Sequence, residues 1–178
     1  MDSYDIVLDS CETDSGFAGM IGFKQLGVVG RGIGMIDADR LHNIDSVQKR
    51  SIAFGSDAGK LSALVRKGVA AVHVSEFRID RKLIEDIAAN DCVLCISTKE
   101  ITNTYGAKRA RMLYKASRLF RLAKKRKIRV AFATMASSLN EMLSKIQLIE
   151  IAKLIGADEQ YARYSIGEIN GYLVNGDD

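Results

Sequence analysis

The sequence predicts an α/β fold: a trimmed or irregular TIM-barrel-like (β/α) barrel that forms a single domain over residues 1–178. Short apolar runs alternate with amphipathic helical stretches, which is the pattern of a parallel sheet covered by helices. No long linker interrupts this alternation, so one barrel is favoured over two domains. The chain is shorter than the roughly 200 residues that a full eight-fold barrel takes, so we expect an incomplete one.

The strands are expected at six short apolar runs. The segment Gly16–Gly34, which includes the second of these runs, shows no regular helical pattern. We expect it to replace one helix of the barrel. The expected strands are Asp5–Asp9, Leu26–Gly30, Ser51–Gly55, Val69–Ser75, Cys92–Ser97 and Arg129–Thr134.

The helices are expected between the later strands, where apolar residues recur at helical spacing. Asp80 is well placed to cap one of them, because an aspartate oxygen can accept hydrogen bonds from the first backbone amides. Leu83, Ile84 and Ile87 then form its apolar face. The expected helices are Ala58–Lys67, Arg81–Asn90, Lys108–Lys127 and Leu139–Ile155, with a short candidate helix at Glu159–Ser165.

Positive charge is concentrated in one of these helices. Lys108–Arg129 holds 11 of the 26 basic residues, and Ile101–Asn140 contains neither Asp nor Glu. Elsewhere 15 basic residues face 22 acidic ones, so the net charge of +4 hides an acidic body with one cationic element. Such an element most naturally binds a polyanion, and a phosphate backbone is the commonest one.

The cationic helix has two faces. One holds Met112, Leu113, Ala116, Leu119, Phe120 and Ala123, and the other holds Arg111, Lys115, Arg118, Arg121 and Lys125. At about 100° per residue the apolar set occupies roughly a third of the circumference. A solvated face normally mixes both signs of charge, so the missing carboxylates favour a polyanion-binding surface. The alternative is a plain surface helix, because Lys and Arg are good helix formers.

Composition indicates a cytoplasmic protein. No apolar run approaches the roughly 20 residues of a membrane span. The acidic start Met1–Asp5 lacks the apolar region of a secretory signal. Three cysteines, an odd number, fit a reducing compartment better than a disulfide framework.

Two motifs carry chemistry in other proteins, and both have a simpler interpretation here. Cys92 and Cys95 have CxxC spacing inside an expected strand, where side chains three apart point to opposite faces and cannot share a metal. We therefore expect core cysteines. The glycines of Gly27–Gly34 could approach a phosphate, but the run matches no established phosphate-binding pattern, which favours a flexible or tightly turned loop.

No catalytic or metal-binding set can be assembled. Only two histidines occur, and His73, flanked by valines, is expected to be a core histidine, which makes a histidine metal site improbable. Four acidic residues near the first strand could bind Mg²⁺ together with a phosphate, or they could be ordinary surface charge. These are Asp5, Asp9, Glu12 and Asp14. The chain is thus expected to be catalytically inactive by itself.

Short motifs follow one another in a recognisable order from Val69 to Arg163. Arg109–Leu113 has the pattern Arg-Ala-x-x-Leu, and Leu122–Lys125 has Leu-x-Lys-Lys in the same helix. Similar short matches occur at Gly68–Ser75, Ile79–Leu83, Cys92–Ser97, Val130–Thr134 and Glu159–Arg163. Together they resemble the archaeal ribonuclease P protein component 3 family, which is related to the eukaryotic Rpp30 subunits. Ser56-Asp57 keeps an aspartate of that family, whereas Leu61-Ser62 replaces its Asn-Arg.

The resemblance implies a non-catalytic, RNA-binding subunit of an endoribonuclease holoenzyme that matures the 5′ end of precursor tRNA. The implied partners are ribonuclease P RNA, precursor tRNA indirectly, and a small ferredoxin-like subunit of the Pop5 type, with no membrane. The chain itself would bind no cofactor, while the RNA of the holoenzyme would need Mg²⁺. The expected phosphate contacts are Arg111, Lys115, Arg118, Arg121 and Lys125, with Lys108, Arg109, Lys124, Arg126 and Lys127 as a second set.

Two other functions remain open. A metal-dependent phosphoesterase of the polymerase-and-histidinol-phosphatase type shares the trimmed barrel, although such enzymes need many His and Asp ligands near the strand ends. A protein-binding scaffold could instead use the basic helix to bind an acidic partner.

Overall fold

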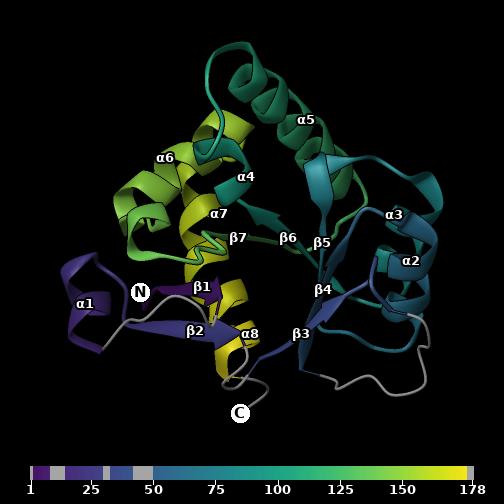
Figure 1. Ribbon diagram of the computed structural model, residues 1–178, viewed down its shortest axis with the longest axis horizontal. Coiled ribbons are helices and arrows are strands. Elements are labelled where there is room, and N and C mark those ends of the chain that lie inside the picture. Colours follow the sequence, from purple (N-terminus) through teal and green to yellow (C-terminus); the bar gives the residue numbers. More distant parts are fainter. Residues whose placement is uncertain (1, 9–14, 30–32, 42–49, 176–178) are drawn as a thin grey trace.

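The computed structural model describes residues 2–8, 15–29, 33–41 and 50–175, and it is a mixed α/β structure with parallel strands (Figure 1). One sheet has two strands and the other has five in chain order. The strands are β1 (Tyr4–Leu8), β2 (Gln25–Val29), β3 (Gly34–Asp37), β4 (Ser51–Gly55), β5 (Ala71–Val74), β6 (Val93–Ser97) and β7 (Val130–Ala133). No closed barrel forms within the described residues, where the sequence predicted a trimmed or irregular one.

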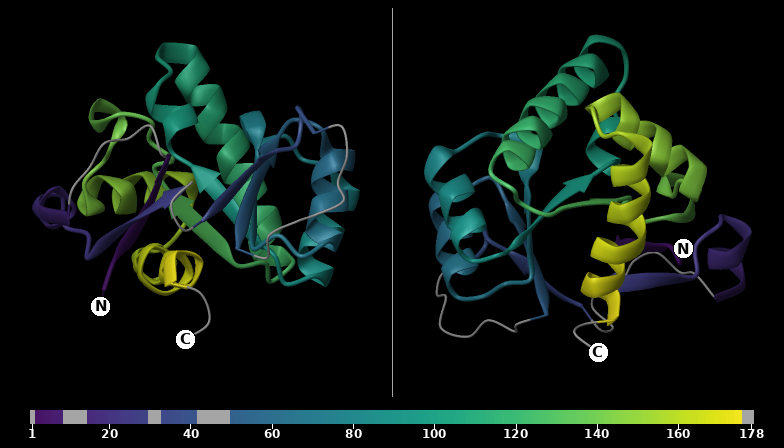
Figure 2. Two further views of the ribbon diagram at one scale, coloured as in Figure 1. Left: turned by 60° about the horizontal axis from the view of Figure 1, so that its bottom comes forward. Right: turned by 180° about the vertical axis from the view of Figure 1, so that it is seen from behind.

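The helices follow the strands as in other α/β folds. They are α1 (Ser15–Met20), α2 (Ala58–Arg66), α3 (Arg81–Ala89), α4 (Lys99–Thr102), α5 (Gly106–Lys125), α6 (Lys145–Ile155), α7 (Glu159–Tyr164) and α8 (Asn170–Asn175). A π-helical segment, Ser165–Ile169, joins the last two into one rod (Figure 2). None of the helices in the described ranges is long and apolar enough to cross a membrane.

Side-chain caps fix where several helices begin. Asp80 accepts a hydrogen bond from the backbone amide of Leu83 at 2.8 Å, as the sequence predicted. Ser144 and Gln147 form a reciprocal capping box, so α6 begins at Lys145 and not at the expected Leu139.

The two faces of the five-stranded sheet pack against different helices. Alternate strand residues such as Val72, Leu94 and Phe132 belong to the core beneath α2, α3, α5 and α6. The residues between them, such as Ala71 and Cys95, belong to a second core. The side chains that this second core receives from the C-terminal rod are Ile169, Leu173 and Val174. The rod thus fills the side of the sheet that faces the interior in a closed barrel.

The C-terminal rod also covers the outer edge of β7 with side-chain hydrogen bonds. The Ser165 hydroxyl donates to the carbonyl of Val130 at 2.8 Å and accepts from the amide of Phe132 at 2.9 Å. The Asn170 amide nitrogen donates to the carbonyls of Phe132 at 2.8 Å and Tyr4 at 3.0 Å. Because unpaired backbone groups are costly to bury, these side chains replace the neighbouring strand that a closed barrel would have provided.

The π-helical segment explains how both side chains reach the same strand. Ser165 and Asn170 are five residues apart, a spacing that places them on different faces of an α-helix with 3.6 residues per turn. In a π-helix, bonded from residue i to i+5, the same spacing is close to one turn. The wider turn therefore aligns the hydroxyl and the amide along β7.

The largest differences from the sequence-based expectation lie near the N-terminus and the C-terminus. Gly16–Gly34 contains all but the first residue of helix α1, together with strand β2 and the first residue of β3. Gly27 lies within β2, where an added Cβ would come 2.5 Å from a methyl carbon of Val174, so the glycine allows the rod to approach. The expectation of a loop at Gly27–Gly34 is wrong at both ends of that segment, which lie in β2 and β3. Residues 30–32 lie outside the described residues. Helices α4 and α8 were not expected.

The expectation of core cysteines is confirmed. Cys92 and Cys95 are both buried and unpaired. Burial raises the pKa of each thiol to about 12, because the apolar surroundings disfavour the thiolate. Neither cysteine is therefore suited to metal binding or redox chemistry.

Candidate nucleic-acid interface

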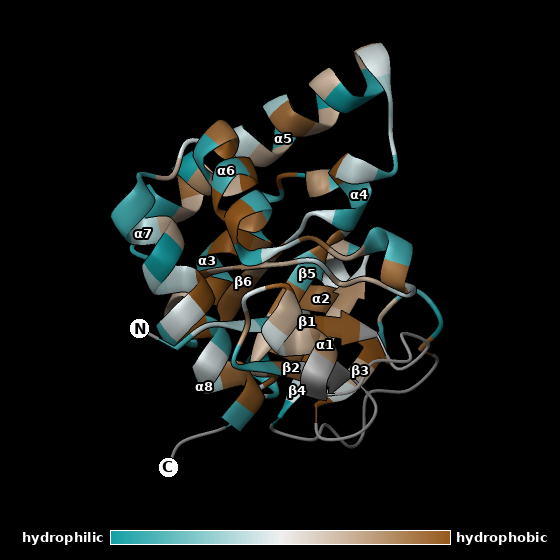
Figure 3. Cartoon of the chain, turned by 90° about the vertical axis from the view of Figure 1, so that its left-hand side faces the viewer, coloured by the Kyte–Doolittle hydropathy of each residue, from teal (hydrophilic) through white to brown (hydrophobic). Residues whose placement is uncertain are grey.

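Helix α5 is anchored by one face and exposes the other. Its buried side chains are Met112, Ala116, Leu119, Phe120 and Ala123, as the periodicity predicted. Phe120 helps to anchor the helix, because its ring lies 5.6 Å from that of Phe132 on β7 and 5.5 Å from that of Tyr161 on α7. The helix stands at the edge of the molecule with its outer side uncovered by other elements (Figures 1 and 3).

The cationic face is defined here as Arg111, Lys115, Arg118, Arg121 and Lys125. All are exposed except Lys115, which is half-buried. Of these five side chains, only that of Lys115 has a carboxylate near it within the described residues, that of Glu76 at 3.7 Å. An exposed pair at this distance contributes little energy, so Lys115 can exchange Glu76 for a phosphate. The structure brings these five predicted residues together on one surface with most of its charge uncompensated.

The second predicted set does not form one surface. Arg109 is half-buried and donates to the carbonyls of Thr104 at 2.6 Å and Thr102 at 3.0 Å, so it caps the end of α4. Lys124 pairs with a carboxylate at 3.3 Å and Arg126 with another at 3.8 Å, those of Asp158 and Glu85. Lys108 is exposed in the first turn of α5, and Lys127 is exposed two residues beyond the end of that helix. These five residues are therefore weaker candidates for a shared contact.

Two exposed aromatic rings accompany the basic residues, and the sequence analysis missed both. Tyr114 is 58% exposed, and Arg118 lies over its ring at 5.8 Å. Tyr105 is 79% exposed, and Arg109 lies over its ring at 5.1 Å. Basic residues interleaved with exposed rings are typical of surfaces that bind unpaired nucleic acid. The signal was present in the sequence, because Tyr114 follows Arg111 by three residues and precedes Arg118 by four.

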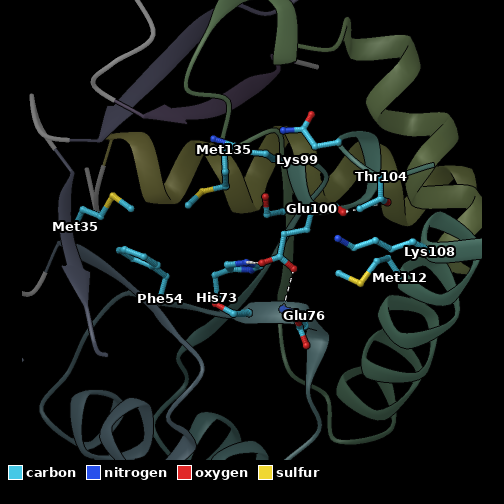
Figure 4. A pocket seen from close by; sticks show the side chains of 13 residues that line it. Met35, Phe54, His73, Glu76, Lys99, Glu100, Thr104, Lys108, Met112 and Met135 are labelled. Carbon is cyan, nitrogen blue, oxygen red and sulfur yellow. Dashed lines mark hydrogen bonds and ion pairs between the residues drawn. The ribbon is translucent and has the colours of Figure 1, made fainter. Parts of the chain in front are cut away.

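A cavity of about 520 Å³ opens beside the N-terminal half of α5, at the carboxyl ends of the parallel strands (Figure 4). This edge carries the sites of parallel α/β proteins in general. Its lining combines apolar and polar side chains: Met35, Phe54, His73, Ser75, Glu76, Ser97, Lys99, Glu100, Asn103, Thr104, Lys108, Met112 and Met135. The sequence analysis missed this site because its residues come from separate strands and helices.

Two of the lining residues, His73 and Glu100, contact each other. His73 is buried, as expected, and its Nδ1 lies 3.1 Å from the carbonyl of Cys95, so Nδ1 must carry a proton to donate. Its Nε2 lies 3.2 Å from Oε1 of Glu100, where an ionised carboxylate can only accept. The backbone amide of Glu76 donates to Oε2 of Glu100 at 2.9 Å, which fixes the carboxyl group further.

Lys99, another lining residue of the cavity, forms an ion pair with a neighbouring carboxylate. Its ammonium group lies 3.1 Å from Oε2 of Glu141. Burial opposes ionisation of Glu141, but hydrogen bonds from the Ser137 amide and hydroxyl, Asn103 and Lys99 outweigh it and lower its pKa to about 2. This ionised acid neutralises Lys99.

The acidic residues near β1 do not form a surface cluster in the described chain. Asp5 is fully buried, and its oxygens accept from the Thr134 amide at 2.8 Å and hydroxyl at 2.6 Å. Burial raises the pKa of Asp5 to about 6. Both interpretations of Asp5, as a surface charge and as a Mg²⁺ ligand, are therefore replaced by a structural role. Asp9, Glu12, Asp14 and His42 lie outside the described residues.

A metal-dependent phosphoesterase gains no support from the part of the chain that the structure describes. No group of three or more His, Cys, Asp or Glu side chains there could hold a metal ion. His73 and Glu100 are adjacent, but they bind each other and the backbone.

Comparison with solved structures shows where this fold occurs. No protein-family model matches the chain, and no curated protein does. A chain in the cryo-electron microscopy structure of archaeal ribonuclease P with mature tRNA superposes with a TM-score of 0.63 at 19% identity, covering 96% of this chain and 82% of that chain.

Two enzymes superpose less closely. A Xaa-Pro dipeptidase with bound methionine gives a TM-score of 0.54 at 15% identity, covering 71% of this chain and 34% of that chain. The ochratoxinase of A. niger gives 0.56 at 9% identity, covering 97% and 54%. At these identities the similarity shows the fold, and this fold is shared by a protein of the ribonuclease P–tRNA structure and by the two enzymes.

Proposed function

We propose that this chain is an RNA-binding protein subunit of ribonuclease P, of the archaeal component 3 (Rpp30) type. It would support the catalytic RNA in 5′ maturation of precursor tRNA and supply no catalytic side chain itself. The observation that carries the proposal is the cationic face of α5, on a helix that contains no carboxylate and is anchored to the core by its opposite side. The fold shared with a chain of archaeal ribonuclease P supports it.

The cationic face would act by neutralising phosphates and releasing their counterions. Arg111 and Arg118 can each donate two parallel hydrogen bonds to one phosphate, whereas Lys125 acts as a point charge. Tyr114 adds a ring on which an unpaired base can stack. Such contacts position an RNA without reading its sequence, which suits a subunit that supports a folded RNA.

The partners would be ribonuclease P RNA directly, precursor tRNA through that RNA, and a small ferredoxin-like subunit of the Pop5 type. Mg²⁺ would be bound by the RNA of the holoenzyme. The acidic remainder of the chain keeps RNA contacts to the α5 side, since like charges repel phosphate.

The proposal is tested by purifying the tagged protein from its native host and sequencing the RNA that accompanies it. One variant carries Arg111→Glu, Lys115→Glu and Arg118→Glu. The control variant reverses three exposed basic residues on α2 and α3, with Arg66→Glu, Arg81→Glu and Lys82→Glu. We expect one abundant structured RNA with precursor-tRNA cleavage activity from the wild type and the control, and its loss from the α5 variant.

Two other results would contradict the proposal. Recovery of no specific RNA with the wild type would refute a ribonuclease P role. Binding of an acidic protein that survives nuclease treatment, and that is lost with the α5 variant, would instead establish the scaffold function.

A further inference from the structure

The cavity at the strand ends is continuous with the cationic face of α5. Lys108 and Met112, both on α5, form part of its wall. Glu76, on its rim, is the residue that contacts Lys115 of the cationic face. A nucleic acid whose phosphates follow α5 therefore passes the cavity mouth.

One half of the cavity is apolar and suits a flat ring. Met35, Phe54 and Met135 line it, with Phe54 next to His73 and Met135 next to Lys99 (Figure 4). Thioether sulfurs and a phenyl ring pack well against aromatic faces, and they adapt to rings of different size. The volume of about 520 Å³ lies within the range of small-molecule sites and suits one nucleotide rather than a duplex.

The other half presents a fixed carboxyl group. Oε2 of Glu100 accepts from the amide of Glu76, Oε1 lies 3.2 Å from Nε2 of His73, and a carboxylate oxygen has a second lone pair with which to accept from a ligand. A ligand that uses both oxygens needs two adjacent donors. Guanine has them on its Watson–Crick edge, as its ring N1–H and its amino group. Adenine and cytosine offer only the amino group on that edge, and uracil offers one N–H.

A free cation completes the polar half. The ammonium group of Lys108 points into the cavity (Figure 4), and no hydrogen bond or ion pair is formed by it within the described residues. Lys99, in contrast, is neutralised by Glu141. Lys108 is therefore available for the phosphate of a nucleotide or for the O6 oxygen of guanine.

We propose that this cavity binds one guanine nucleotide, with its base against Met35, Phe54 and Met135 and its Watson–Crick edge on Glu100. Lys108 binds the anionic part. The nucleotide is either an unpaired residue of a bound RNA or a free mononucleotide. The RNA source rests on the function proposed above, whereas the guanine chemistry of the site does not.

Methionine methyl groups provide a direct test. The chain has six methionines, of which three line the cavity. In protein labelled with ¹³C at the methionine methyls, titration with guanosine 5′-monophosphate should shift the signals of Met35, Met112 and Met135 and leave that of Met20 unchanged. Adenosine, cytidine and uridine 5′-monophosphates should bind about tenfold more weakly, since each lacks one charge-assisted hydrogen bond.

Variants locate the contact. Glu100→Gln should weaken guanosine 5′-monophosphate binding about tenfold and abolish the preference over adenosine 5′-monophosphate. Glu150→Gln, the same change on the exposed side of α6, should alter neither. Because Glu100 also holds His73, circular dichroism must show that the variant is folded. If it is not, Lys108→Met provides the second variant and should weaken all four mononucleotides.

A titration with RNA distinguishes the two possible sources of the nucleotide, a bound RNA and a free mononucleotide. A single-stranded oligonucleotide with one guanine is compared with the same strand carrying an abasic site at that position. Shifts of the cavity methyls with the guanine strand, and not with the abasic strand, assign the site to RNA. Shifts with the mononucleotide alone assign it to a free nucleotide.

The inference would be overturned if no probe shifted the signals of the cavity methyl groups. It would also be overturned if all four mononucleotides bound with equal affinity. The function proposed above has its own readout in the same samples, namely RNA binding that is lost on charge reversal at Arg111, Lys115 and Arg118. That binding can persist while the cavity stays empty, so the two failures are distinguishable.

Discussion

Neutralising three residues of the cationic face should flatten the salt dependence of RNA binding. The residues are Arg111, Arg118 and Lys125, each changed to Gln, and all three lack a carboxylate partner in the described structure. Each phosphate contact contributes about 0.7 to 0.9 to the slope of log affinity against log salt concentration. Five contacts thus give a slope of about −3.5 to −4.5, and the two that remain give about −1.4 to −1.8.

These slopes translate into a measurable difference. Between about 50 and 200 mM salt, affinity should fall by about two to three orders of magnitude for the wild type and about tenfold for the variant. Lys115 counts among the five because its exposed contact with Glu76, at 3.7 Å, contributes less than about 1 kcal/mol.

The assay is fluorescence anisotropy with a labelled structured RNA at a series of salt concentrations. The variant Arg66→Gln, Arg81→Gln and Lys82→Gln removes the same charge from α2 and α3 and should keep the wild-type slope. Equal slopes for the α5 variant and the wild type would remove the cationic face from the RNA interface, however much affinity had changed.

Three further predictions follow from particular contacts. Replacing Tyr114 by Ala should weaken binding of single-stranded RNA by about 1 to 3 kcal/mol without changing the salt slope, measured by the same anisotropy titration, while Tyr114→Phe keeps the affinity. Gly27→Ala should lower the free energy of unfolding in urea by about 1 to 3 kcal/mol, because its Cβ would overlap Val174; an unchanged midpoint would contradict the close approach. Burial raises the pKa of Asp5 from 3.8 to about 6, so the folded state binds this proton more tightly than the unfolded state. The contribution of Asp5 to stability is therefore full below pH 3.8 and falls by about 3 kcal/mol as the pH rises to about 6. Urea unfolding across that range should show this fall for the wild type relative to Asp5→Asn, and parallel curves would disprove it.

Periodicity predicted the parts of the fold that depend on local pattern. Helix α5 begins and ends within two residues of the expected Lys108–Lys127, and its buried face is the predicted one. Strand β4 matches the expected Ser51–Gly55. These elements bury a regular stripe or a continuous apolar run, so the sequence carries their signal directly.

Other elements depend on partners far away in the chain. Strand β3, at Gly34–Asp37, is short and starts with a glycine, and it is a strand because β4 pairs with it in parallel. Ser165 and Asn170 are ordinary polar residues in sequence, and only the π-helical turn aligns them with β7. Chain length predicted an incomplete barrel, but no local pattern in the sequence predicted the helix that covers its open edge.

The candidate sites divide in the same way. The cationic face lies on one helix and could be predicted from spacing alone. The cavity combines residues from several strand ends with two helices, so no spacing in the sequence reveals it. Tyr114 is the intermediate case, because its position in the helical pattern was visible but an aromatic residue is usually assigned to the core.

The covering of β7 by the C-terminal rod has a consequence for the order of events during synthesis. The ribosome completes β7 before it adds Tyr161, Ser165 and Asn170, the residues that satisfy its outer edge. Until those residues have emerged and packed, β7 presents a strand edge able to pair with another chain. A chain that ends between Ala133 and Asn170 would keep this edge open permanently, so it should self-associate or recruit a chaperone where the full-length chain does not.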